Sequence, residues 1–212
     1  MTPRTRIKIC GIREVEHARL AAREGADAIG LVFHAQSPRC IDVERAAEVA
    51  AALPPFVMAV GLFVDAPEAE VRRVLSRVRL DLLQFHGGES PADCERYAVP
   101  YLRAVRMEEG VDLVEYAHRF SRAKALLLDA HVPGEPGGTG RTFDWARIPR
   151  DLPIPFVLSG GLDAGNVGRA VRETRPWAVD VSSGVERERG VKDPAKIAAF
   201  IRSVQREDVR PA

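Results

Sequence analysis

Two side chains with reactive groups stand where apolar runs of the sequence end. Cys10 closes the first such run, and Asp129 follows Ala-Leu-Leu-Leu, where a carboxylate at the end of a buried strand would be partly desolvated. Alternation along a strand places Lys8 on the face of Cys10, one layer below it, where its positive charge is expected to lower the pKa of the thiol. A buried lysine needs an acidic partner, and Asp180 is the candidate.

Two turns of small residues follow the last two apolar runs. They are Gly160-Gly161 and Ser182-Ser183-Gly184, about 22 residues apart. Without bulky side chains, their backbone N–H groups can approach an anion, so the pair predicts a phosphate site. Valine at Gly161 or Gly184 is therefore expected to weaken phosphate binding while the melting temperature changes little.

These residues need elements to position them, and the sequence alternates between two patterns. Short, near-continuous apolar runs are typical of buried parallel strands, and segments with apolar residues at i, i+3 and i+4 predict helices between them. The expected strands are 7–10, 28–33, 56–64, 80–85, 100–105, 123–129, 154–158 and 178–181. The expected helices are 14–24, 43–53, 67–77, 91–98, 111–120, 164–174 and 194–205, with a brief turn of helix from Asp144-Trp145. Ser90 and Asp193 are the predicted N-caps of two helices, and Pro67, Pro91 and Pro194 are expected in first helical turns.

Eight strands that alternate with helices predict either a (β/α)8 TIM barrel or a doubly wound sheet. The barrel is favoured because the last two strands carry the phosphate signature and no early G-x-G-x-x-G fingerprint occurs. In a barrel the reactive residues gather at the carboxyl ends of the strands. That prediction brings Cys10, Arg39, Gln84, His86 and Asp129 to one mouth.

Composition narrows the class of protein. With 212 residues, 46% of them hydrophobic, the chain predicts one domain over residues 1–212. A formal charge of +1 argues against a nucleic-acid partner, and the longest apolar run, 56–64, is too short to cross a bilayer. We therefore expect a cytoplasmic protein. The three cysteines have no C-x-x-C spacing, which argues against disulfides and zinc; Cys40 and Cys94 are interpreted as small buried apolar residues, and no metal is expected.

Motifs in order along nearly the whole chain resemble one family. They are Lys-Ile-Cys-Gly-Ile at 8–12, Ser-Pro-Arg at 37–39, Gln-Phe-His-Gly at 84–87, Leu-Asp at 128–129, Gly-Gly-Thr-Gly-Arg-Thr-Phe-Asp-Trp at 137–145, Gly-Gly-Leu at 160–162 and Asp-Val-Ser-Ser-Gly-Val-Glu at 180–186. This set resembles phosphoribosylanthranilate isomerase. Arg13 departs from the family, since it stands where the first helix usually opens with Thr, and this puts the cap of that helix in doubt.

The resemblance implies an enzyme of tryptophan biosynthesis. It would convert N-(5-phosphoribosyl)anthranilate to 1-(2-carboxyphenylamino)-1-deoxyribulose 5-phosphate, an Amadori rearrangement that needs no cofactor. By the same resemblance Asp129 is the general acid, Cys10 the general base, and Arg39 the ligand of the anthranilate carboxylate. Gln84, His86 and Asp180 complete the implied substrate-binding residues, and Gly160, Gly161, Ser182, Ser183 and Gly184 hold the phosphate. The expected partner is a small phosphorylated substrate, and the chain is expected to be a monomer or a homodimer.

Two other readings stay open at this stage. One is a sister phosphate-binding barrel of histidine biosynthesis, or an enzyme with both activities, which is expected to need a second phosphate loop near strands 3 and 4. Only Gly87-Gly88 hints at such a loop. The other is a non-catalytic barrel that binds a phosphosugar, which would not need Cys10 and Asp129 at opposed strand ends.

Overall fold

The computed structural model describes residues 4–130 and 142–208 and has a closed barrel of eight parallel strands at its centre. Each strand pairs with the next in sequence, and β8 pairs back onto β1, with Lys8 opposite Asp180. The strands are β1 (Arg6–Cys10), β2 (Ala28–Val32), β3 (Met58–Phe63), β4 (Leu82–Phe85), β5 (Tyr101–Arg106), β6 (Ala125–Asp129), β7 (Phe156–Leu158) and β8 (Ala178–Val181). The closure confirms the (β/α)8 barrel and excludes the doubly wound sheet.

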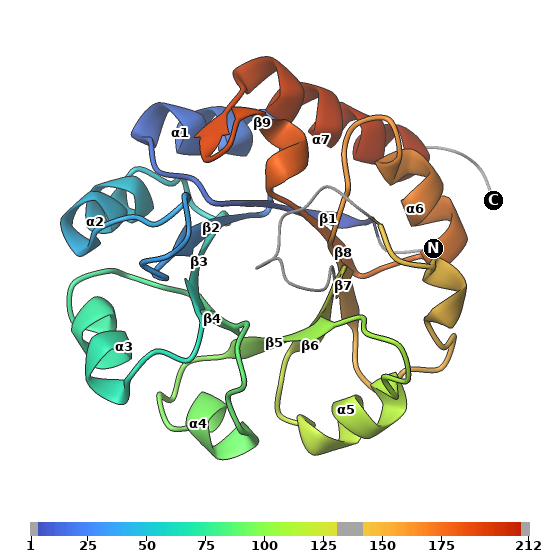
Figure 1. Cartoon of the computed structure of the whole chain (residues 1–212). Coiled ribbons are helices and arrows are strands. Elements are labelled where there is room, and N and C mark those ends of the chain that lie inside the picture. The colour runs from blue at the N-terminus through green and yellow to red at the C-terminus, as the bar shows by residue number, and fades with distance from the viewer. Residues whose placement is uncertain (1–3, 131–141, 209–212) are drawn as a thin grey trace.

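Helices form a ring around the strands, as Figure 1 shows. They are α1 (Val15–Glu24), α2 (Val43–Ala51), α3 (Glu68–Leu75), α4 (Pro91–Glu95), α5 (Leu113–Arg119), α6 (Val167–Thr174) and α7 (Pro194–Asp208). Two 3₁₀ turns, η1 (Trp145–Arg147) and η2 (Ser183–Val185), and a small antiparallel pair, β9 (Glu186–Glu188) with β10 (Val191–Lys192), complete the described elements. The expected helices are therefore all present, and the brief one after Asp144 is the 3₁₀ turn η1.

Several helices are shorter than expected, and local side chains set the starts of two of them. The α5 helix begins at Leu113 because Asp112 accepts hydrogen bonds from the N–H groups of Val114 and Glu115. The α6 helix begins three residues later than expected, since Asp163 accepts hydrogen bonds from the N–H groups of Gly165 and Asn166 and holds that segment in a turn. Ser90 forms a capping box with Asp93 at α4, which confirms that predicted cap.

Of the other predicted caps, Asp193 is confirmed, because its carboxylate accepts the first free N–H groups of α7. Pro67 is the N-cap of α3 and so lies one position before the first turn. The α1 helix has Glu14 at its N-cap and no side-chain cap. This is the cap that Arg13 put in doubt.

The core has two parts, one outside the barrel wall and one within it. Alternate residues of the strands, including Leu102, Ala104, Leu127 and Val157, pack together inside the barrel. Toward the carboxyl ends of the strands, beyond this apolar layer, lie buried polar side chains such as Asp129. The barrel interior is therefore apolar in its middle and lined by polar side chains near the carboxyl ends of the strands. No helix among residues 4–130 and 142–208 has the length and apolar character that crossing a membrane requires.

Candidate active site

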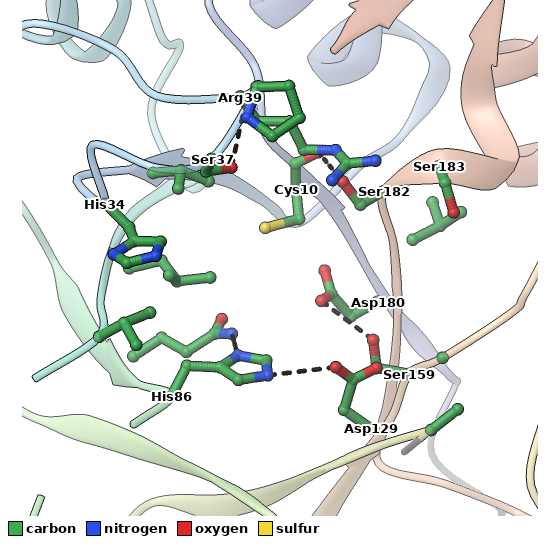
Figure 2. Close-up of a pocket in the computed structure, with 18 of the residues that line it drawn as sticks. Cys10, His34, Ser37, Arg39, His86, Asp129, Ser159, Asp180, Ser182 and Ser183 are labelled. Atoms are coloured by element: carbon green, nitrogen blue, oxygen red, sulfur yellow. Dashed lines mark hydrogen bonds and ion pairs between the residues drawn. The ribbon is translucent and has the colours of Figure 1, made fainter. Parts of the chain in front are cut away.

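A cavity of about 410 Å³ opens at the carboxyl ends of the strands. All the predicted site residues line it except Gly184. Figure 2 shows Cys10 on one side of this cavity and Asp129 on the other, with Asp180 between them and His86 beside Asp129. The structure thus brings together two reactive groups that are 119 positions apart in the sequence.

Cys10 ends β1 and is 5% exposed, with its sulfur directed into the cavity (Figure 2). Gly30, its partner on β2, makes room for the thiol, because a Cβ there would lie 2.7 Å from Sγ. Burial raises the pKa of Cys10, and the opposing charge of Lys8 does not overcome it. The expectation of a lowered thiol pKa was therefore wrong for the enzyme without substrate, because desolvation, together with the negative charge of Asp180, outweighs the two nearby cations Lys8 and Lys192.

The predicted partner of Lys8 is confirmed. Its Nζ donates to Oδ1 of Asp180 at 2.9 Å, and both side chains are about 5% exposed. Burial opposes the charge on Lys8, but Asp180 and Cys10 together raise the pKa of its ammonium group. Ser159 donates a longer hydrogen bond, 3.4 Å, to the other oxygen of Asp180. The predicted contact between Asp180 and substrate stays a prediction.

Asp129 ends β6 and is 7% exposed. Its Oδ2 lies 3.1 Å from Nε2 of His86, whose Nδ1 lies 3.0 Å from Nε2 of Gln84. No other side chain in the described part of the chain bonds to the carboxyl group, so Oδ1 is directed to the cavity without a partner there. An acid in this position has one oxygen held by protein and one available to a ligand.

Arg39 reaches the cavity from the loop after β2 and is held by a carboxylate 147 positions away. Its Nε and Nη2 donate to the two oxygens of Glu186 at 2.7 and 2.9 Å. Lys192 donates to the same carboxylate at 2.8 Å. Burial opposes ionisation of Glu186, but the bonds from Arg39 and Lys192 lower its pKa to about 2. Two of the three guanidinium nitrogens are thus used for positioning, and Nη1 has no partner among the described residues.

The two small-residue turns lie beside each other at the rim. Gly160 and Gly161 have φ angles of 82° and 65°, and the N–H groups of Gly161, Ser183 and Gly184 donate to no acceptor within residues 4–130 and 142–208. Such unpaired donors at the start of a short helix suit an anion. Gly184 has a second constraint, since a Cβ there would lie 2.0 Å from the carbonyl oxygen of Leu162. Valine at Gly184 therefore cannot leave the fold intact, contrary to the expectation from sequence.

The loop after β4 does not offer a second phosphate site. The N–H of Gly87 donates to Glu89 at 2.8 Å, and that of Gly88 donates to Asp65 at 2.6 Å. Glu89 is itself paired with buried Arg103 at 2.7 Å. The donors that a phosphate would need are occupied by carboxylates, whose charge would repel it.

Several residues that the sequence did not single out also line the cavity: His34, Gln36, Asp65, Arg106, Ser159 and Arg189. Arg106 ends β5 beside Asp129 and could have been found by reading every strand end. Arg189 lies in the turn between β9 and β10, a strand pair that no sequence pattern predicted. Residues 137–141 of the glycine-rich motif lie outside the described residues. Within those described, no group of three or more His, Cys, Asp or Glu could hold a metal ion.

Comparisons with known proteins show the family of the chain. The family model for N-(5′-phosphoribosyl)anthranilate isomerase matches residues 7–203. A protein of that name from Pseudomonas aeruginosa is 55% identical over 203 residues, which is 96% of either chain.

Solved structures give the same result. The phosphoribosyl anthranilate isomerase of Thermotoga maritima superposes with a TM-score of 0.87 and 41% identity over 95% of this chain and 98% of that one. A second such structure (TM-score 0.84, 38% identity, coverage 95% and 98%) is a complex with reduced 1-(o-carboxyphenylamino)-1-deoxyribulose 5-phosphate. A third, with the same scores and coverage, concerns monomers made from the dimeric Thermotoga maritima enzyme. The chain belongs to the N-(5′-phosphoribosyl)anthranilate isomerase family.

Proposed function

We propose that Asp129 and Cys10 are the acid and base with which this isomerase of tryptophan biosynthesis rearranges its substrate. The observation that carries the proposal is their placement on opposite sides of one cavity, each at the end of a barrel strand (Figure 2). Protonated Asp129 gives its proton to the furanose ring oxygen of N-(5-phosphoribosyl)anthranilate. The C1–O bond then breaks, its electrons pass to oxygen, and the nitrogen lone pair forms a protonated C=N bond.

Cys10 acts in the second step. Its thiolate takes the C2 proton, the electrons of the C–H bond form a C1=C2 double bond, and the C=N electrons pass to nitrogen. The resulting enolamine gains a proton at C1 and loses the proton of its C2 hydroxyl, which gives 1-(2-carboxyphenylamino)-1-deoxyribulose 5-phosphate. The positive iminium lies beside the thiol in this step, and its charge lowers the pKa of Cys10, which Lys8 does not achieve in the enzyme without substrate. A base with a raised pKa in the free enzyme is thus compatible with the reaction, because substrate itself favours the thiolate.

Binding is assigned to two sets of groups at the rim of the cavity. Nη1 of Arg39 is proposed to bind the anthranilate carboxylate, with the rest of the guanidinium held by Glu186. The phosphate is proposed to bind the N–H groups of Gly161, Ser183 and Gly184 in the two small-residue turns. His86 and Asp180 line the space between. No cofactor has a part in this scheme.

The histidine-pathway alternative is less well supported. It needs a second phosphate loop, and the N–H groups of Gly87 and Gly88 are taken by Glu89 and Asp65. We expect no turnover of the phosphoribosyl-aminoimidazole substrate. A chain that binds a phosphosugar without turnover would not need the opposed thiol and acid.

The experiment is a turnover assay with freshly made phosphoribosylanthranilate, followed by the loss of its fluorescence. Cys10→Ser and Asp129→Asn should each lower kcat by on the order of 10²-fold or more, with KM little changed. Cys40→Ser and Asp151→Asn are matched controls, since neither residue lines the cavity, and both should retain wild-type kcat. Near-wild-type kcat in Cys10→Ser would remove the thiol from the mechanism, and wild-type kcat in both site variants would refute the assigned roles.

We further propose that the chain is one barrel domain and, of the two oligomeric states left open by the sequence, a homodimer. A dimeric relative is known in Thermotoga maritima. This chain also exposes large apolar side chains, Phe56, Met58 and Trp177, all near the amino ends of barrel strands. A cytoplasmic location remains a prediction.

A further inference from the structure

Three side chains form a hydrogen-bonded chain that the acid and base roles do not explain. Gln84 on β4 is 1% exposed, and its amide nitrogen lies 3.0 Å from Nδ1 of His86. The other ring nitrogen of His86 lies 3.1 Å from Oδ2 of Asp129 on β6 (Figure 2). The backbone N–H of His86 donates to the carbonyl of Phe63 at 2.9 Å, which fixes the backbone position from which the imidazole side chain projects.

The imidazole ring passes over β5 to make this connection. Arg106 is the β5 residue in register with Asp129, and the inward residue before it is Ala104, which packs in the barrel interior with Leu127. A small residue there leaves space for the ring between β4 and β6. The chain Gln84–His86–Asp129 is thus built across three strands rather than along one loop.

The donors and acceptors of this chain determine each other. In the amide orientation of this structure the nitrogen of Gln84 faces Nδ1 of His86 and can only donate, so Nδ1 accepts and carries no proton, while Oε1 of Gln84 is buried without a partner among the described residues. A neutral ring then has its proton on Nε2, which donates to Oδ2 of Asp129. An oxygen that accepts this bond is not the one that holds the acid proton, so the proton of Asp129 is left to Oδ1.

We propose that Gln84 is a positioning residue that fixes His86 in the Nε2–H tautomer and thereby directs the acid proton of Asp129 to Oδ1, the oxygen that faces the cavity. The inference rests on the proposed role of Asp129 as the acid. In the opposite arrangement the ring proton is on Nδ1, and the acid proton points at Nε2 of His86 instead of at substrate. Once Asp129 has given up its proton, the Nε2–H bond stabilises the carboxylate that remains.

The tautomer can be measured directly in the enzyme without substrate. Protein labelled with ¹⁵N-histidine should show His86, identified by the signals lost in His86→Phe, with a protonated Nε2 and an unprotonated Nδ1. In Gln84→Met, which keeps the size of the side chain but removes the donor, the two tautomers should mix and the two ¹⁵N shifts should converge. An Nδ1–H ring in the wild type, or an unchanged pattern in Gln84→Met, overturns the inference.

Kinetics separate positioning from packing. Gln84→Met should lower kcat on the order of tenfold with KM changed less than about twofold, because the proton is misdirected while binding survives. The double variant Gln84→Met/His86→Phe should have the kcat of His86→Phe alone, since Gln84 acts only through the ring. A further loss in the double variant would mean that Gln84 supports the barrel in another way and would overturn the proposal.

Two further variants complete the design. Gln205→Met is the matched control: Gln205 is exposed on α7 and donates to the carbonyl of Glu24 at 3.1 Å, so neither kcat nor the His86 signals should change. Should Gln84→Met fail to fold, Gln84→Glu decides, because its carboxylate accepts from Nδ1 and should give a ring protonated on both nitrogens. An unaltered ring in Gln84→Glu refutes the coupling. Because the ¹⁵N measurement needs no substrate, its result does not depend on whether the isomerase mechanism is correct.

Discussion

At the scale of the single residue, the first prediction concerns the pH dependence of alkylation at Cys10. Burial raises the pKa of this thiol despite the neighbouring Lys8. Below its pKa the thiolate fraction falls tenfold per pH unit, so alkylation of Cys10 by iodoacetamide should be slow at neutral pH and accelerate until the pH exceeds the ordinary thiol pKa of about 8.5. Mass spectrometry of the Cys10 peptide across the pH range measures this. A rate that levels off below about pH 7 would instead indicate a stable thiolate and contradict the desolvation argument.

The other cysteines give internal references in the same experiment. Cys94 is 0% exposed and does not line the cavity, and burial raises its pKa to about 12, so reagent should reach it more slowly than Cys10 at every pH. Cys40, which lies outside the cavity, should be labelled equally with and without bound product. Product should protect Cys10 alone, and alkylation of Cys10 alone should abolish turnover.

At the scale of the element, two substitutions in the turn at η2 should distinguish its role in phosphate binding from its role in folding. Ser183 is partly exposed and lines the cavity, so Ser183→Glu should place a negative charge in the phosphate site and raise KM by on the order of tenfold, with an unchanged melting temperature. Gly184→Val should lower the melting temperature, because its Cβ meets the Leu162 carbonyl at 2.0 Å. Ser121→Glu, on an exposed turn, is the control for added charge. Equal KM values in Ser183→Glu and wild type would show that the phosphate does not bind at this turn.

The β9–β10 pair has its own test, because it is joined to the loop after β2 through Glu186. Glu186→Gln would leave Arg39 and Lys192 buried without their shared anion, and the free energy of unfolding at pH 7 should fall by roughly 3–5 kcal/mol. The sign of the pH dependence follows from the lowered pKa of about 2. The stabilisation is complete above the unfolded value of about 4.3 and is lost as the pH falls toward 2, so wild type and variant should converge in acid.

Urea unfolding at several pH values measures this difference. Glu188→Gln is the matched control, since Glu188 lies on the same strand, is exposed and makes only a 4.0 Å contact with Arg187. Its effect should stay within about 0.5 kcal/mol. A Glu186→Gln difference that does not shrink between pH 7 and pH 3 would show that shape rather than charge holds the hairpin.

At the scale of the whole molecule, the proposed homodimer can be tested at the exposed aromatic residue near the amino end of the barrel. Phe56 is fully exposed and has a φ of 70°, a conformation that a bulky side chain rarely adopts. If it packs against a second copy, light scattering should give a dimer at micromolar concentration, and Phe56→Asp should give a monomer with kcat unchanged, because Phe56 is outside the cavity. Ala69→Asp, exposed on α3, is the control. A monomeric wild type, or a dimeric Phe56→Asp, would exclude this interface.

The amino-acid sequence determined the order and type of almost every element, because the signals that specify them are local. A buried strand flanked by helices must be apolar on both faces, and each run of this kind was found to within about two residues. Side-chain caps such as Ser90 and Asp193 act within a few positions and were also predictable. The position of Cys10 and Asp129 at strand ends followed from the same reasoning, since parallel strands in a barrel place their carboxyl ends together.

Only the tertiary structure decided which groups distant in sequence contact one another and how they change each other's pKa. The burial of Cys10 beside Lys8 and Lys192 and the sharing of Glu186 by Arg39 and Lys192 depend on distances that no sequence spacing encodes. The same is true of the contact that His86 makes with Asp129 across β5. The sign of a pKa shift is a balance between desolvation and charge, and both terms are set by the packed surroundings. The sequence by itself could therefore name the reactive residues, whereas their protonation and hydrogen-bond partners were determined by barrel closure.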